Sequence, residues 1–152
     1  MDLKYETIEA GQRYEALKLG NQLCFPLYAC SREIIKRYKP FLDELDLTYT
    51  QYITMMVLWE KKTINVKTLG DALYLDSGTL TPLLKKLEAK GLVSRERSLD
   101  DGRNLIVTIT EQGEALKERA VTVPFEIAKC TSITAEDAAA LYQILYKILG
   151  TK

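Results

Sequence analysis

The sequence predicts an α+β fold, mainly α, and two observations carry this prediction. Apolar residues recur at three- and four-residue spacing through most of the chain, which is the pattern of amphipathic helices. The exception is a short run of β-branched residues, LIVTIT at 105–110, which favours a strand. A chain of 152 residues is expected to form a single domain, residues 1–152, and its 47% hydrophobic content suffices for a buried core.

Three helical segments are expected in the first part of the chain. Residues 21–45 show helical spacing, and Pro40 is expected to end or bend that helix, because proline lacks the N–H that the ladder needs. Residues 48–60 predict a second helix that is mostly buried. Residues 66–93 predict two helices joined by a short turn.

The last third of the chain is also expected to be helical. Thr110 can cap a new helix, and the charge of Glu111 is favourable near its N-terminus. The stretch TAED at 134–137 resembles a capping box with aspartate in place of glutamate. It predicts a final amphipathic helix that runs through Leu149.

The composition excludes several classes of protein. The chain has no histidine, and its three cysteines form no CxxC pair, so we expect neither a zinc site nor a secreted disulfide framework, and no metal or cofactor. There is no run of about 18 apolar residues and no secretory signal at the polar N-terminus. A cytoplasmic location without a membrane partner is the default expectation.

The net charge is zero, but the charges are unevenly distributed. Residues 61–104 carry 9 basic and 6 acidic side chains, whereas 1–60 carry 7 and 9, and 105–152 carry 5 and 6. The positive excess therefore lies in the middle third, where a polyanionic partner such as DNA would be attracted. The neutral or acidic ends are free for another task, such as pairing with a second subunit.

The segment SGTLTPLLKKLEAKGL, residues 77–92, has the character of a DNA-reading helix. Its leucines share one face of a helix, and the opposite face carries small, hydroxyl and lysine side chains. Small residues and free N–H groups at a helix N-terminus suit close approach to a phosphate or a base edge. An ordinary surface helix with solvated lysines is the alternative interpretation.

The next residues predict a basic hairpin. VSRERS and LIVTIT read as two strands, and the DDG between them is a strong turn signal. A helix-turn-helix followed by such a hairpin is the winged-helix arrangement, in which the wing places an arginine in the minor groove. Arg103 is the candidate, although it could instead pair with Asp100 or Asp101.

These stretches resemble the MarR family of winged-helix repressors, and in particular its organic hydroperoxide-sensing branch. The resemblance runs from about Leu17 to Val123 and includes DSGTLTP, DDGR, NQLCFPLY and YKPFLDELDLTYTQY. It implies a homodimer held together by helices within about 17–60 and 111–152, with the winged helix-turn-helix at about 61–110. It also implies a repressor of double-stranded operator DNA that organic hydroperoxides inactivate by oxidising one cysteine. The expected DNA-binding residues are Ser77, Thr79, Thr81, Lys85, Lys86, Arg95, Arg97, Asp101 and Arg103.

The resemblance places the redox-sensing cysteine at Cys24 and its tyrosine partners at Tyr28, Tyr38 and Tyr49. Tyr28 follows Cys24 by four residues and shares its helical face. Tyr38 lies fourteen residues on, roughly 21 Å away along a straight helix, so it can reach only the cysteine of a second subunit. Phenol hydroxyls could donate hydrogen bonds to a thiolate in place of the absent imidazole. The alternative is that these tyrosines only pack at an interface.

The other cysteines and one proline raise further expectations. Pro26 would be tolerated only in the first turn of a helix, so we expect the helix to begin close to Cys24, with the thiol near the positive end of the dipole. Cys30 lies about 9 Å along the helix from Cys24, too far for a disulfide, and is expected to be a packing residue. The resemblance suggests Cys130 as the resolving cysteine, with capping of Cys24 by a small cellular thiol as the alternative.

Two other functions remain open at this point. A MarR-type regulator could instead respond to a small aromatic ligand bound between the dimerisation and DNA-binding regions, with Cys24 as a bystander. An enzyme is not expected, because turnover as a peroxidase needs a reductant system that the sequence does not reveal.

Overall fold

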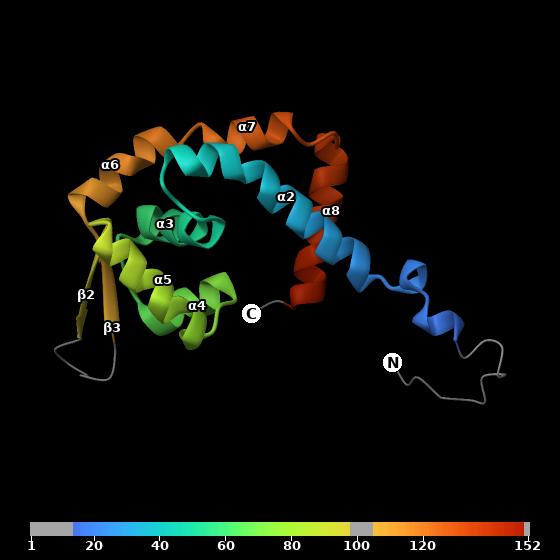
Figure 1. Ribbon diagram of the computed structural model, residues 1–152, viewed down its shortest axis with the longest axis horizontal. Helices are drawn as coiled ribbons and strands as arrows, with labels where there is room; N and C mark the ends of the chain where they lie inside the picture. The colour runs from blue at the N-terminus through green and yellow to red at the C-terminus, as the bar shows by residue number, and fades with distance from the viewer. Residues whose placement is uncertain (1–13, 98–104, 151–152) are drawn as a thin grey trace.

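The computed structural model describes residues 14–97 and 105–150, which form helices and one small sheet at one edge of the molecule (Figure 1). The elements are 3-10 helices η1 (Glu15–Leu17) and η2 (Leu19–Asn21), α2 (Cys24–Glu44), α3 (Tyr49–Lys61), β1 (Thr63–Asn65), α4 (Val66–Leu73), α5 (Ser77–Ala89), β2 (Val93–Arg97), β3 (Leu105–Ile109), α6 (Glu111–Ala120), α7 (Val123–Lys129) and α8 (Ala135–Leu149). The expected mainly helical α+β fold is confirmed. Helix α2 spans the molecule, with α3, α4 and α5 on one side of it and α7 on the other.

Side-chain caps mark the starts of α3, α6 and α8. The hydroxyl of Thr110 accepts a hydrogen bond from the N–H of Gly113, and that of Thr134 accepts one from the N–H of Asp137. Both caps confirm the sequence predictions. Thr48 and Gln51 form a reciprocal capping box at the start of α3, so two free donors of that helix are satisfied.

The two prolines of α2 have different outcomes. Helix α2 begins at Cys24, which makes Pro26 its third residue, where a missing N–H costs no hydrogen bond. That expectation is confirmed. Pro40 does not end the helix, because α2 continues to Glu44, in line with the helical spacing over 21–45, and a bend at Pro40 stays a prediction. Proline prevents only one ladder bond, and Leu42 in the turn that follows is buried, so packing can hold the helix together beyond it.

The sheet has three antiparallel strands in the order β1-β3-β2. The hairpin strands β2 and β3 were predicted, but β1 was not, because three residues carry no alternation that a sequence pattern could detect. Strand β1 pairs with β3 from Thr63 opposite Thr108 to Asn65 opposite Ile106. The base of the hairpin is therefore three strands wide, whereas its outer part has only two.

The core lies between α3, α5 and the sheet. Fully buried side chains include Met55 and Leu58 from α3, Leu84 and Leu87 from α5, and Val107 from β3. Such close packing is typical of protein interiors and leaves little space for added atoms.

One tight contact joins this core to the C-terminal helices. The indole Nε1 of Trp59 donates a buried hydrogen bond of 2.8 Å to the carbonyl of Gly113 in α6. A Cβ on Gly113 would clash with the carbonyl oxygen of Leu92 and would lie 2.8 Å from the side chain of Ile109. This close approach requires glycine.

Gly113→Ala should therefore lower the free energy of unfolding by about 1–3 kcal/mol, the usual cost of overpacking a filled site. Urea denaturation followed by circular dichroism measures the change. Gly20→Ala is the matched control, because nothing lies within 4 Å of its added Cβ. Equal stability of Gly113→Ala and the wild type would show that α6 can move away at no cost.

Candidate functional site

Helix α5 presents the polar face that the sequence predicted. Its leucines at 80, 83, 84 and 87 are buried, while five polar residues are exposed: Ser77, Thr79, Thr81, Lys85 and Lys86. Asp76 caps the helix by accepting bonds of 2.9 Å from both the N–H and the hydroxyl of Thr79. The exposed side chains therefore stand on a rigid helix with a fixed first turn.

The turn between α4 and α5 is held by a close backbone approach. A Cβ on Gly70 would lie 2.8 Å from the carbonyl oxygen of Leu75, so only glycine lets the turn pack this tightly on α4. The N–H of Leu75 donates to the carbonyl of Gly70 at 2.9 Å. This contact fixes α5 relative to α4, which is the helix-turn-helix geometry that a reading helix needs.

The basic hairpin is present, and its arginines differ in their surroundings. Arg97 is exposed near the outer end of β2. The guanidinium of Arg95 is instead held by the Glu88 carboxylate of α5. Asp101 and Arg103, together with Asp100, lie outside the described residues.

Cys24 is exposed at the first residue of α2. Tyr28, one turn further on, is 58% exposed and accepts a hydrogen bond of 3.0 Å from Nη1 of Arg32. The Arg32 guanidinium also lies over the Tyr28 ring, 5.5 Å from its centroid. Within one chain, Tyr28 is therefore engaged with Arg32.

The other two predicted tyrosines lie together at the far end of α2. The rings of Tyr38 and Tyr49 meet edge to face with centroids 5.0 Å apart, and Tyr52 lies 6.0 Å from Tyr38. Burial raises the pKa of Tyr38, and Tyr49 raises it further; burial likewise raises the pKa of Tyr49. Both hydroxyls stay protonated at neutral pH and remain hydrogen-bond donors. Because α2 is continuous, they lie roughly 20 Å from Cys24 of the same chain.

The remaining cysteines lie on different elements. Cys30 is exposed in the single chain, so it does not pack into this chain's core, and its role as a packing residue stays a prediction. Cys130 is the C-cap residue of α7, and its carbonyl accepts a hydrogen bond from Arg37 of α2. Arg37 lies thirteen residues from Cys24, so Cys130 sits near the middle of α2 and not near its start.

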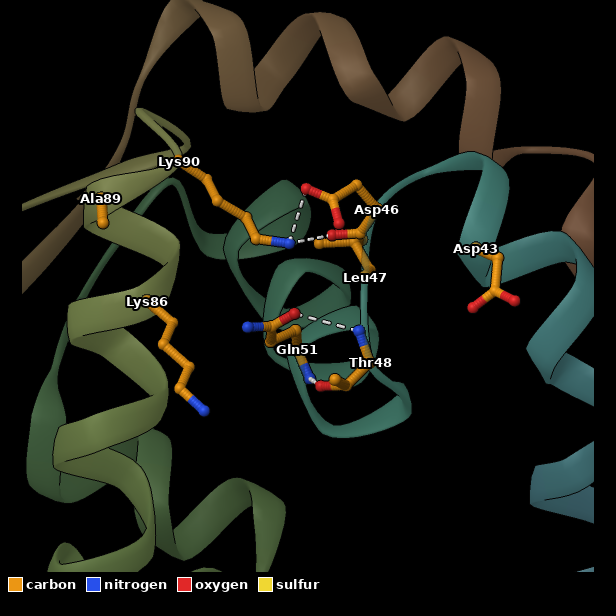
Figure 2. A pocket seen from close by; sticks show the side chains of 8 residues that line it. All are labelled: Asp43, Asp46, Leu47, Thr48, Gln51, Lys86, Ala89 and Lys90. Atoms are coloured by element: carbon orange, nitrogen blue, oxygen red, sulfur yellow. Dashed lines mark hydrogen bonds and ion pairs between the residues drawn. The ribbon is translucent and has the colours of Figure 1, made fainter.

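An open cavity of about 650 Å³ lies where the ends of three helices meet (Figure 2). Asp46 and Thr48 line one wall, and Lys86 and Lys90 of α5 line the other. Lys90 forms an ion pair of 2.8 Å with the Asp46 carboxylate and also donates to the Asp46 carbonyl. The sequence patterns did not reveal this contact, because 44 residues separate its partners.

Comparison with known proteins decides the family. The family described as "Transcriptional regulator SarA/Rot" matches residues 36–120, more than half of the chain. The chain belongs to this family. Its members resemble MarR-type winged-helix regulators, so the predicted fold and the predicted class of transcriptional regulator are confirmed.

One similar protein and two structures of a second one narrow the comparison. The organic hydroperoxide resistance transcriptional regulator of Bacillus subtilis is 49% identical over 139 residues, 91% of this chain and 95% of the relative. Reduced AbfR bound to DNA, a Staphylococcus epidermidis protein, is 35% identical with a TM-score of 0.74, covering 91% of this chain and 96% of that one. Disulfide-formed AbfR is also 35% identical, with a TM-score of 0.63, covering 93% and 100%.

The Asp76 cap gives a pH-dependent prediction. Hydrogen bonds from Thr79 lower the pKa of Asp76 below its ordinary value, so the ionised cap stabilises the folded state above about pH 4 and is lost as the pH falls through the lowered pKa. Asp76→Ala should therefore be less stable than the wild type at pH 7, and the difference should shrink towards pH 2. Urea midpoints across this range measure it, with Asp76→Asn as the control that keeps a capping oxygen. A difference that stays constant with pH would contradict the role of the charge.

Proposed function

We propose that this protein is a homodimeric DNA-binding repressor that releases its operator when an organic hydroperoxide oxidises Cys24. The observation that carries the proposal is the position of Cys24, exposed at the first residue of a long helix, in a chain that is 49% identical to the Bacillus hydroperoxide resistance regulator. Operator DNA places this function in the cytoplasm. The role is regulatory and not enzymatic.

Uncovered apolar surface supports the homodimer. All 15 residues of α8 are described, and none of them is buried, although Tyr142, Ile144, Tyr146, Ile148 and Leu149 are large and apolar. Leu19, Leu23 and Phe25, at the start of α2 and before it, are exposed as well. Single apolar residues are normal on a surface, but this many large apolar side chains on two exposed segments are typical of an interface. Helices within 17–60 and 111–152 would form it, leaving the winged helix at 61–110 free for DNA.

The DNA interface follows from the exposed face of α5. Ser77, Thr79 and Thr81 would meet base edges and phosphates in the major groove, and Lys85 and Lys86 the flanking backbone. The wing, through Arg97, Arg103 and the neighbouring Asp101, would reach the minor groove. Two such units in a dimer would read half-sites about one helical turn apart.

The chemistry begins with the ionised thiol. The thiolate of Cys24 attacks the terminal oxygen of the hydroperoxide, the O–O bond breaks, and the products are a sulfenic acid and an alkoxide that takes a proton to become an alcohol. The positive end of the α2 dipole favours an anion at this place. In the dimer, Tyr38 and Tyr49 of the partner subunit would donate hydrogen bonds to the sulfur, with Tyr28 nearby.

The sulfenic acid would then react with Cys130 of the partner subunit to give a disulfide and water. Within one chain the two cysteines are too far apart, because Cys130 is held beside Arg37 and a disulfide needs Cα atoms within about 7 Å. The comparison with AbfR supports a change of shape: this chain matches the reduced, DNA-bound form better than the disulfide form, with TM-scores of 0.74 and 0.63. Capping of Cys24 by a small thiol is the alternative.

The cavity beside Lys86 and Lys90 favours a second candidate function, a regulator that responds to a small aromatic ligand. A volume of about 650 Å³ lies within the usual range for ligand pockets. Mass spectrometry after one equivalent of cumene hydroperoxide separates the two functions, because only the proposed function requires selective oxidation of Cys24.

Cys24→Ser should bind the operator as the wild type does but should stay bound after treatment with cumene hydroperoxide. Serine is close in size and exposed at this position, while its hydroxyl cannot be oxidised in the same way. Gel shifts with and without peroxide measure both properties, and Cys30→Ser is the matched control that should still respond. Release of Cys24→Ser by peroxide would rule out Cys24 as the sensor.

The disulfide gives a separate prediction. Mildly oxidised wild type should run as a covalent dimer on a non-reducing gel, Cys130→Ser should run as a monomer, and Cys30→Ser should still form the dimer. A wild-type protein that is fully released from DNA yet monomeric on the gel would show that a small thiol, and not Cys130, resolves the sulfenic acid.

A further inference from the structure

Glu88 and Arg95 join the helix that reads DNA to the first strand of the wing. Glu88 lies in the last turn of α5, and Arg95 is the middle residue of β2. The Arg95 atoms Nε and Nη2 lie 3.0 and 2.5 Å from one carboxylate oxygen of Glu88. The Arg95 side chain is only 17% exposed, which leaves it little access to a phosphate or a base.

The position of Arg95 in the sheet explains why its guanidinium group points toward α5. Arg95 lies opposite Val107 of β3, and paired residues share one face of a sheet. Val107 is fully buried and Val93, two residues before Arg95, is also buried, so this is the core-facing side. The stem of Arg95 therefore covers apolar surface while its guanidinium emerges at Glu88. Sequence reasoning missed this pair, because an arginine on a basic hairpin was assigned to DNA.

Arg95 also lies close to the place where the sheet changes from three strands to two. Strand β1 pairs with β3 at Ile106, Val107 and Thr108, so Arg95 lies in the three-stranded base, whereas Arg97 lies opposite Leu105, beyond β1. A two-stranded ribbon has little stability of its own. Its direction is therefore set at the base, where Arg95 is fixed to α5.

We propose that Glu88 and Arg95 are positioning residues that fix the angle between α5 and the wing, so that major-groove and minor-groove contacts fit one operator together. Arg95 acts through Glu88 and does not touch DNA. The inference rests on the proposed function, because it needs a wing that binds DNA. Hydrogen bonding from Arg95 lowers the pKa of the Glu88 carboxyl, so the pair is charged at neutral pH.

Electrostatics and positioning predict opposite results for Glu88→Gln. The substitution removes a negative charge close to DNA, and attraction to phosphates alone would then tighten binding. Positioning predicts weaker binding, because the neutral amide holds the guanidinium less firmly. Glu96→Gln is the matched control: it changes the charge equally on the neighbouring residue of β2, which is exposed and lies on the opposite face of the strand.

The experiment is a double-mutant cycle with the proposed wing contact, Arg103→Ala, measured as operator affinity of the reduced dimer by fluorescence anisotropy. Glu88→Gln should weaken binding about tenfold in the wild-type background, within the range of one lost arginine contact. In the Arg103→Ala background it should weaken binding less than about twofold, because the wing no longer contributes. Glu96→Gln should not weaken binding in either background.

If Glu88→Gln weakens operator binding equally in both backgrounds, the inference is overturned, because a general effect on folding does not depend on Arg103. If Glu88→Gln does not weaken binding at all, the inference is overturned as well. The double variant Glu88→Arg with Arg95→Glu exchanges the two side chains and tests the inference again. Its operator affinity should return to within about threefold of the wild type, consistent with one modest contact. An affinity as low as that of Glu88→Gln would contradict the inference. Arg103→Ala alone tests the proposed function separately, because an unchanged affinity would show that the wing makes no such contact.

Discussion

The unbroken length of α2 is the constraint on which the proposed sensor depends. The helix runs from Cys24 to Glu44, and each residue adds about 1.5 Å, so its two ends stay roughly 30 Å apart. Cys24 stands at one end, and the tyrosine pair of Tyr38 and Tyr49 stands near the other. A thiol that needs phenol donors cannot find this pair within its own chain. Two chains in opposite orientation can bring one chain's thiol to the other's tyrosines, and the apolar surface that would bring them together is uncovered.

The C-terminal end of α2 connects this helix to the DNA-binding part. Lys90 at the end of α5 holds Asp46 in the turn after α2, and Arg119 of α6 donates to the carbonyl of Glu44 in the last turn of α2. The Arg119 contact satisfies a carbonyl that the helix end leaves free, and both positive charges suit the negative end of the dipole. These contacts also connect the end of α2 directly to α5 and α6. A disulfide that moves the start of α2 could therefore change the position of α5 through these contacts.

Sequence patterns predicted the long elements well, because periodicity and capping are local. A start of α2 close to Cys24 followed from the tolerance of Pro26 in a first turn, and the caps at Thr110 and Thr134 followed from their residue types. What the sequence could not predict depends on contacts between distant residues. Strand β1 exists because β3 offers it an edge. For the candidate site, the residue type was informative, because the sequence identified Arg95 as a basic residue of the wing. The sequence did not reveal the partner of Arg95, which is Glu88.

The two candidate signals, oxidation and ligand binding, would act on the same contact, the ion pair between Asp46 and Lys90. The cavity lies between the end of α2, the start of α3 and the end of α5, and its walls include both Asp46 and Lys90 (Figure 2). An anionic or aromatic occupant would compete with Asp46 for Lys90, whereas a disulfide would move α2 and carry Asp46 with it. Either event would weaken the contact between Asp46 and Lys90. A ligand can shift the equilibrium only as far as its affinities for the two states differ, while a covalent bond imposes the new geometry. A disulfide formed by Cys24 at the start of α2, as proposed, would therefore change this contact more completely than a bound ligand would.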